Sequence, residues 1–191
     1  MIFGLPILVV DDLVDAHTLS QIQDRAGQIY SEVEPTGHDW MCDVYSTCHD
    51  YNLLRDQAFE GLHDAMCRRV NNDFLNKHGI LDTVIPSGSW LNAYSSEQYQ
   101  EQHKHPNNWV SAVYFLDAPE GSAPLTFHNP NLSDLSFNKQ KWTHLLEFKN
   151  YDAVTNRLIV FLSHTPHSVG QGTNEELRFT VATNYVLHEE T

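Results

Sequence analysis

Hydrophobic residues in the first part of the chain recur at intervals of three and four positions. Because an α-helix has about 3.6 residues per turn, this spacing predicts two amphipathic helices, one in residues 15–33 and one in residues 55–78. Gly79 follows Lys77 and His78, which indicates the end of the second helix. We expect both apolar stripes to pack against a sheet. The stripe residues are Leu19, Ile22, Ala26, Ile29 and Val33, then Phe59, Leu62, Met66, Val70 and Phe74.

Beyond Gly79 the spacing changes to two, which is typical of β-strands. In residues 177–187, Arg178 and Thr180 alternate with Phe179 and Val181, so the two pairs face opposite sides of the strand. Short strands after two helices predict a mainly β fold, a β-sandwich or jelly roll backed by helices. No repeat or long linker divides the chain, so residues 1–191 should form one domain. The predicted strands cover Ile7 to Val10 and residues 87–95, 109–117, 124–128, 158–163 and 177–187.

Composition removes several classes of function. The 191 residues carry a formal net charge of −14, which argues against nucleic acid as the main partner. No run of 18 apolar residues is present, and the apolar start lacks a basic region, so neither a membrane span nor a signal peptide is predicted. The three cysteines show no CxxC spacing, which favours free thiols and a cytoplasmic location.

Histidine is the unusual residue, with 12 copies against 11 lysines and arginines. His103 and His105, in the stretch HKHP, have the spacing that places two side chains on the same side of an extended segment. Imidazole is the commonest metal ligand in proteins, so these two side chains are candidate ligands. The best third ligand is His167, just after an apolar strand. His164 is a reserve, and Glu101 shares the strand parity of His103 as a fallback carboxylate.

Arg178 and Thr180 lie on the small, polar face of the last strand. A buried guanidinium without a negative partner is costly, and no acidic residue lies in that strand. A bound carboxylate would supply the charge, with the Thr180 hydroxyl as a second contact. An ion pair of Arg178 with Glu175 or Glu176 is the alternative.

The ordered motifs resemble those of the 2-oxoglutarate- and iron(II)-dependent oxygenases. They are W-x-N-x-Y at 90–94, H-x-H-P at 103–106, S-x-V-Y-F-L at 111–116, P-L-x-F at 124–127, H-S-V at 167–169 and R-x-T at 178–180. The most similar branch comprises bacterial and phage proteins related to prolyl hydroxylases. This resemblance implies a double-stranded β-helix, which is a jelly roll that encloses the metal, and the use of iron(II), 2-oxoglutarate and O2.

The resemblance also implies a role for each matching residue. His103 and His167 would be the first and the distal iron ligand, and His105 stands where most relatives have a carboxylate. 2-Oxoglutarate would chelate the iron, and its far carboxylate would bind Arg178 and Thr180. Tyr94 and Tyr114 are further candidate contacts for this co-substrate, Tyr94 the stronger of the two. The substrate would be a peptide, a protein or a small molecule, with a prolyl side chain as the leading hypothesis.

Two other classes of function stay open at the level of the sequence. One is a three-histidine, cupin-type metal oxygenase that does not use 2-oxoglutarate, and the other is a non-catalytic jelly-roll module. The pair of Arg178 and Thr180 favours the 2-oxoglutarate-dependent reading over the first alternative. The long segment 129–157 lacks a clear pattern, and we expect part of it to cover the entrance to the site.

Overall fold

The computed structural model describes residues 4–37, 40–130 and 147–188. Its two α-helices are α1 (Ala16–Glu32) and α2 (Glu60–Arg68). Shorter helical segments flank α2: η1 (Leu53–Arg55), η2 (Gln57–Phe59), η3 (Arg69–Leu75) and η4 (Asn76–His78). The strands are β1 (Ile7–Val10), β2 (Tyr45–Ser46), β3 (Val84–Tyr94), β4 (Gln100–His103), β5 (Val110–Asp117), β6 (Leu125–His128), β7 (Phe148–Tyr151), β8 (Arg157–Leu162), β9 (His167–Val169) and β10 (Arg178–Leu187).

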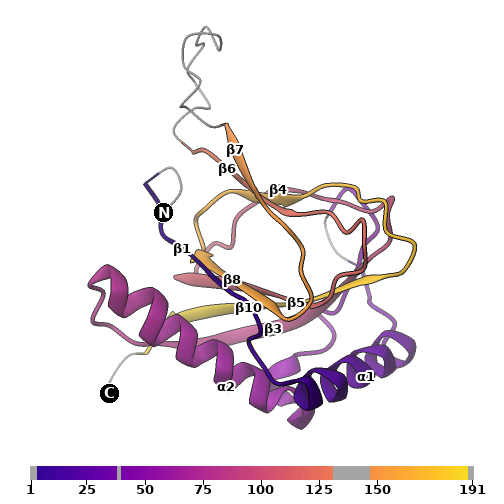
Figure 1. Ribbon diagram of the computed structural model, residues 1–191, viewed down its shortest axis with the longest axis horizontal. Coiled ribbons are helices and arrows are strands. Elements are labelled where there is room, and N and C mark those ends of the chain that lie inside the picture. Colours follow the sequence, from indigo (N-terminus) through magenta and orange to yellow (C-terminus); the bar gives the residue numbers. More distant parts are fainter. Residues whose placement is uncertain (1–3, 38–39, 131–146, 189–191) are drawn as a thin grey trace, which may run out of the picture.

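The strands form two antiparallel sheets. The larger sheet has the order β1-β8-β5-β10-β3-β2, and the smaller sheet has the order β4-β9-β6-β7. Helices α1 and α2 cover the outer face of the larger sheet, and the smaller sheet lies on its other side (Figure 1). This arrangement is the double-stranded β-helix backed by N-terminal helices, so the predicted mainly β fold is confirmed.

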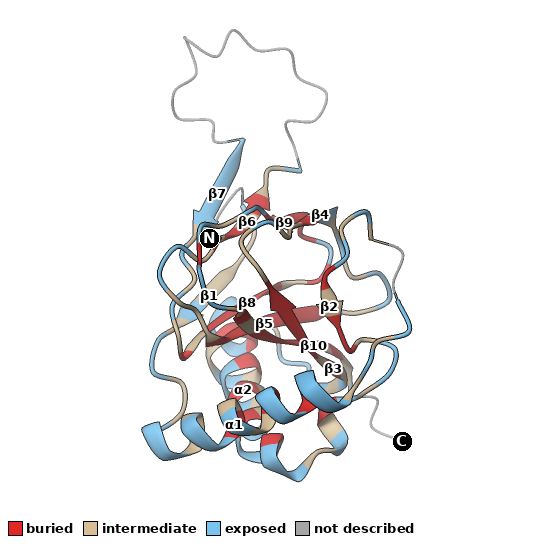
Figure 2. Cartoon of the chain, turned by 90° about the vertical axis from the view of Figure 1, so that its right-hand side faces the viewer, coloured by how far each residue is buried: buried red, intermediate tan, exposed pale blue. Residues whose placement is uncertain are grey.

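Alternation along the strands of the larger sheet separates two hydrophobic cores. In β5, Ala112 and Tyr114 belong to the core beneath the helices, whereas Phe115 belongs to the core between the two sheets and Val113 packs against it. The central strands of this sheet are therefore buried on both faces (Figure 2). The inner core also contains Leu125, Phe127, Ile159, Phe161 and Val169.

Helix α1 confirms the first predicted amphipathic segment. The Asp15 side chain accepts hydrogen bonds from the backbone N–H groups of His17 and Thr18, at 2.9 and 3.0 Å, and thereby caps the first turn. The predicted apolar stripe faces the sheet: Ile22, Ala26 and Ile29 are buried, and the stripe's two end residues are partly buried against the same core.

The second predicted helix is interrupted by wider, π-helical winding in η3. Asn71 lies in this segment, where its amide donates to the carbonyl oxygens of Cys67 and Val84 at 3.1 Å and accepts from the Val84 N–H at 2.9 Å. The wider winding thus places the Asn71 amide where it can form hydrogen bonds with the start of β3. As predicted, it ends at Gly79, which has a positive φ of 72°.

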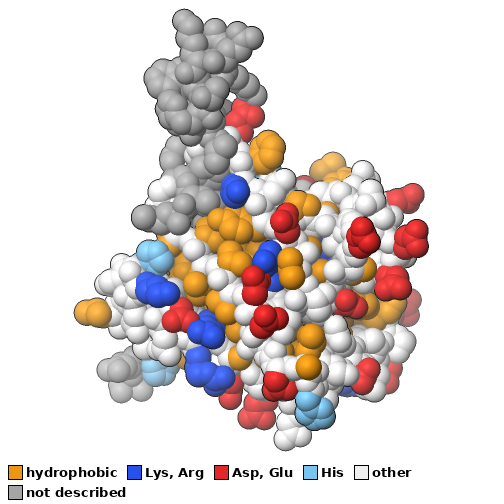
Figure 3. Space-filling view, in the orientation of Figure 1, with side chains coloured by type: hydrophobic (Ala, Val, Ile, Leu, Met, Phe, Trp, Pro, Cys, Tyr) orange, Lys and Arg blue, Asp and Glu red, His pale blue; other side chains and the backbone are white. Residues whose placement is uncertain are grey.

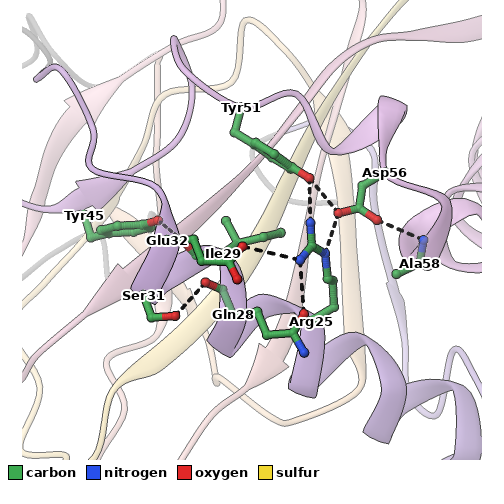
Figure 4. Close-up of polar contacts among 9 residues, drawn as sticks. All are labelled: Arg25, Gln28, Ile29, Ser31, Glu32, Tyr45, Tyr51, Asp56 and Ala58. Carbon is green, nitrogen blue, oxygen red and sulfur yellow. Dashed lines mark hydrogen bonds and ion pairs between the residues drawn. The ribbon is translucent and has the colours of Figure 1, made fainter.

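A partly buried ion pair fixes α1 to the segment that precedes α2. Arg25 Nε donates to Asp56 Oδ2 at 2.8 Å, and the Tyr51 hydroxyl bridges the same two side chains (Figure 4). Asp56 also accepts from the Ala58 N–H at 3.0 Å. Although burial alone would raise the pKa of Asp56, the hydrogen bonds from Arg25, Tyr51 and Ala58 hold it below its ordinary value.

Charged side chains are unevenly distributed over the face of the molecule shown in Figure 3, and the three cysteines form no disulfide. Acidic side chains are spread over the right-hand part of this face, and basic ones lie mainly to the left. Cys42, Cys48 and Cys67 are all free thiols. Within the described ranges, we find no helix with the length and apolarity that a membrane span requires. The predicted cover in residues 129–157 falls largely on 131–146, which lie outside the described residues.

Candidate active site

Strand pairing places two of the predicted ligands directly opposite each other. His103 ends β4 and His167 begins β9, and the two residues are partners in the antiparallel register. His105 lies just beyond the end of β4, where its backbone N–H donates to the Ser163 carbonyl at 3.0 Å. The backbone thus brings three histidines from two distant segments to one end of the smaller sheet.

The three imidazoles converge. One nitrogen from each of His103, His105 and His167 lies within 4.8 Å of the others, and this is the group of possible metal ligands found in the described part of the chain. The Nε2 atoms of His105 and His167 are 3.1 Å apart. These separations suit three ligands that share one first-row metal ion.

Backbone carbonyl groups orient two of the rings. His103 Nδ1 lies 2.8 Å from the Glu101 carbonyl oxygen, and His167 Nδ1 lies 2.9 Å from that of Thr165. Since a carbonyl oxygen only accepts, both Nδ1 atoms carry the proton and both Nε2 atoms keep a free lone pair. Ligating histidines typically have this second hydrogen bond, so the two rings fit a metal.

Burial keeps the site neutral before metal binds. Desolvation lowers the pKa of His103, lowers the pKa of His105 to about 4, and holds that of His167 well below its ordinary range. Neutral imidazole is the form that binds a metal ion, so no proton has to leave at neutral pH.

Arg178 forms the opposite end of the same cavity. It is only 2% exposed, and its Nη1 donates to the Ala123 carbonyl at 2.7 Å. Its guanidinium carbon lies 4.1 Å from the centre of the Tyr94 ring. Nε has no hydrogen-bond partner, and no ion pair to Arg178 is found among the described residues. A buried cation with a free N–H group fits an incoming carboxylate.

Residues of both sheets form the remaining walls of the cavity. Trp90, Asn92 and Tyr94 project into it from β3, as the alternation of W-x-N-x-Y predicts, and Thr180 lies beside Arg178 on β10. The Tyr94 hydroxyl donates to Gln100 Oε1 at 3.1 Å, and burial raises the pKa of Tyr94 to about 12. The complete lining is Trp90, Asn92, Tyr94, Gln100, His103, His105, Val113, Phe115, Leu125, His167, Val169, Arg178, Thr180 and Ala182.

Tyr114 lies elsewhere, and the expectation that it contacts the co-substrate is corrected. Its side chain points to the helix-covered face of β5, and its hydroxyl donates to Asn156 Oδ1 at 2.8 Å. The physical reason is strand parity: Phe115, one residue later, faces the cavity instead. Among the reserve ligands, His164 is exposed, and the Glu101 carboxylate accepts from the Met41 N–H.

The sequence analysis assigned no role to three polar residues at the site. Asn92 and Gln100 line the cavity, and Asn184 approaches the His105 ring, at 3.4 Å from its Nδ1. A signal existed for two of them. Asn92 shares its strand parity with Trp90 and Tyr94, and Asn184 shares its parity with Arg178.

Comparison with known proteins identifies the class. The family described as "Putative 2OG-Fe(II) oxygenase" matches residues 88–184, about half of the chain. The chain belongs to this family of 2-oxoglutarate/Fe(II)-dependent oxygenases. It is therefore an enzyme that uses Fe(II), with 2-oxoglutarate and O2 as co-substrates. A search of curated proteins finds no match.

Solved structures share the fold at low sequence identity. A prolyl-4-hydroxylase from Pseudomonas putida is 16% identical, with a TM-score of 0.64 over 97% of this chain and 95% of that one. A prolyl hydroxylase from Trichoplax adhaerens, solved with a hypoxia inducible factor peptide fragment, is 15% identical, with a TM-score of 0.68 over 96% and 84%. HygX from Streptomyces hygroscopicus, solved with nickel and 2-oxoglutarate, is 9% identical, with a TM-score of 0.64 over 95% and 83%.

Proposed function

We propose that the chain, folded as a single domain, is a hydroxylase whose iron(II) is held by His103, His105 and His167. Arg178 and Thr180 hold the far carboxylate of 2-oxoglutarate, and Tyr94 packs against the Arg178 guanidinium. The observation that carries this assignment is one cavity with three neutral, convergent imidazoles at one end and a buried, unpaired guanidinium at the other. A metal-chelating dicarboxylate matches both ends.

The protein's own contribution is binding, orientation and exclusion of water. Iron(II) and 2-oxoglutarate, once bound, supply the oxidising chemistry. The carbonyl groups of Glu101 and Thr165 fix two ligand rings, and the inner core closes the cavity floor with Phe115. Arg178 binds the far carboxylate of 2-oxoglutarate, so that the keto-acid end of this molecule points toward the histidines.

His105 is the departure from the usual ligand set of two histidines and one carboxylate. A third neutral imidazole leaves the bound metal with one more positive charge than a carboxylate would. No carboxylate from the described residues joins the cluster, and the Glu101 side chain is turned toward Met41. We therefore assign His105, and not Glu101, as the third ligand.

Metal content of histidine variants tests the site. His103→Ala and His167→Ala should each lose stoichiometric Fe(II) or Ni(II) binding, because two remaining imidazoles hold a metal ion weakly. His164→Ala is the matched control, since this exposed histidine lies only three residues from His167. Equilibrium dialysis followed by elemental analysis gives the content. Unchanged metal in the His167→Ala protein would reject the ligand set.

The substrate we propose is a peptidyl side chain, prolyl in the first instance. Support comes from two structural neighbours that are prolyl hydroxylases, one of them solved with a peptide. The test incubates the Fe(II)-loaded enzyme, 2-oxoglutarate and O2 with proline-containing peptides, and mass spectrometry detects the gain of one oxygen atom. Succinate formed without any modified peptide would support the enzyme class and reject the substrate.

The family match disfavours the alternative of a metal oxygenase that does not use a keto acid, although the three-histidine donor set would suit one. Such an enzyme has no need for the buried guanidinium of Arg178. Substrate oxidation without 2-oxoglutarate, at the rate seen with it, would select this alternative.

A further inference from the structure

Facing residues of β3 and β10 divide the long wall of the cavity into three levels. Both strands carry a polar side chain at the first two levels, whereas at the third level a polar side chain on β3 faces a small methyl group. In order from the Arg178 end, the antiparallel register pairs Tyr94 with Arg178, Asn92 with Thr180, and Trp90 with Ala182, and all six residues line the cavity.

The indole N–H group of Trp90 is a buried donor that has no acceptor within the protein. Its Nε1 atom is buried, yet it makes no hydrogen bond. A buried donor without an acceptor is unfavourable, so a group of this kind in a ligand cavity points to an acceptor on the ligand. The centres of the Trp90 and His105 rings are 5.9 Å apart, so this donor belongs to the histidine end of the cavity.

The co-substrate 2-oxoglutarate is too short to occupy all three levels. Tyr94 and Trp90 lie four residues apart on one strand, which corresponds to roughly 13 Å. The carbon chain of 2-oxoglutarate has four C–C bonds and extends over roughly 5 Å. With its far carboxylate at Arg178 and Thr180, this molecule fills the first two levels and ends at the metal. The third level is therefore left for the substrate.

The third level suits an uncharged substrate group. No carboxylate from the described residues lines the cavity, so a lysyl or arginyl side chain would lack an anionic partner there. A substrate carboxylate would lack a cation, because Arg178 lies two levels away and binds the co-substrate. Trp90 offers a donor, and Ala182 is small enough to leave room beside it. A neutral group with an acceptor oxygen, such as the carbonyl of an amide, fits both features.

We propose that Trp90 and Ala182 form the substrate subsite, in which the Trp90 indole N–H donates a hydrogen bond to an amide carbonyl oxygen close to the carbon that is oxidised. This inference rests on the proposed function and deepens it. It makes Trp90 a specificity-determining residue, and it names the substrate class as a peptide with an uncharged side chain at the oxidised position. Lysyl and arginyl residues fall outside this class because their side chains are cationic.

Proton and nitrogen-15 NMR of the tryptophan indole groups tests this contact without turnover. The protein is loaded with Zn(II) and 2-oxoglutarate, and the probes are two peptides of equal length that differ only in a central prolyl or lysyl residue. The Trp90 signal is assigned by its loss in the Trp90→Phe protein. Its proton should move downfield and reach saturation with the prolyl peptide, because a hydrogen bond forms, and should not do so with the lysyl peptide.

Peptide affinity of variants, measured by calorimetry on the same loaded protein, gives an independent readout. Trp90→Phe keeps an aromatic ring but removes the donor, so the prolyl peptide should bind about 3–10-fold more weakly, as expected for one neutral hydrogen bond. Ala182→Val narrows the subsite and should also weaken the peptide. Both variants should bind Zn(II) and 2-oxoglutarate as the wild type does. Trp109→Phe is the matched control, because Trp109 is 52% exposed and lies outside the cavity lining.

The outcomes separate this inference from the proposed function. Wild-type protein that binds neither Zn(II) nor 2-oxoglutarate would reject the proposed function itself. Equal affinity of the loaded wild-type and Trp90→Phe proteins for the prolyl peptide would overturn only the role of Trp90. The inference also fails if Trp90→Phe weakens 2-oxoglutarate more than the peptide, if the lysyl peptide binds as tightly as the prolyl one, or if neither peptide binds the loaded protein.

Discussion

Replacing Arg178 by Met should abolish tight binding of 2-oxoglutarate while leaving the metal in place. Methionine has a similar length and fills the space beside Tyr94, but it has no charge and no donor. The wild-type guanidinium is 2% exposed, and its Nε has no partner until a carboxylate arrives. The substitution therefore removes the charged anchor at the end of the cavity away from the histidines.

The loss can be estimated from the contacts available. A hydrogen bond to a charged group contributes about 1.5–3 kcal/mol, and the planar guanidinium can offer two of them to one carboxylate. If the Thr180 hydroxyl retains part of the interaction, about 3 kcal/mol is lost, which corresponds to at least about a hundredfold increase in Kd.

Isothermal titration of 2-oxoglutarate into Ni(II)-loaded protein measures this change without turnover. Arg157→Met is the matched control, because Arg157 pairs with Asp11 at the surface, outside the cavity lining. Metal affinity, determined separately, should be the same in both variants. A Kd for 2-oxoglutarate within about threefold of the wild-type value, in Arg178→Met protein with full metal content, would refute the role of Arg178.

Three further predictions concern stability. Burial lowers the pKa of His63 to about 4 from its ordinary 6.5, so the unfolded chain binds a proton at this residue that the folded chain excludes. His63 should therefore contribute a fall of up to about 3 kcal/mol in the unfolding free energy as pH drops through this range, and His63→Gln should reduce the slope by that amount in urea titrations at several pH values. Asp56→Asn leaves the partly buried Arg25 without its charged partner and should cost about 2 kcal/mol in urea denaturation, whereas Asp73→Asn breaks an exposed pair and should cost under about 0.5 kcal/mol. Gly121 has a φ of +84°, and a Cβ there would lie 2.8 Å from the Thr173 carbonyl carbon, so Gly121→Ala should lower the melting temperature; Gly27→Ala, inside α1 with open space, should raise it, and the reverse order would contradict the packing described.

Periodicity was sufficient for the parts of the fold in which one face is buried. The apolar stripes of α1 and α2 and the alternation in β3 and β10 follow from burial alone, and they locate the cavity-facing side of each strand. The short strands β4 and β9 show too few residues for a periodic signal. Their pairing, which sets His103 against His167, depends on contacts between segments 64 residues apart in the sequence.

Some residues of the site could likewise be proposed from the sequence, and others could not. His103, His105, His167 and Arg178 could be proposed from their spacing and strand parity, and from the order of the motifs that resemble those of the oxygenases. Asn184 was not proposed: its parity with Arg178 places it on the same side of the strand, but its contact with the His105 ring depends on the tertiary fold. The misplacement of Tyr114 was a parity error, and that signal was available in the sequence.

Anaerobic addition of Fe(II) and 2-oxoglutarate to the protein tests the central assignment most directly. A chelate of the keto acid with iron in a protein site has a weak visible charge-transfer band. We predict that this band appears with both components, saturates at one equivalent of each per chain, and is lost in the His167→Ala protein. Its absence in folded wild-type protein that has bound Fe(II) would contradict the assignment of this cavity to 2-oxoglutarate.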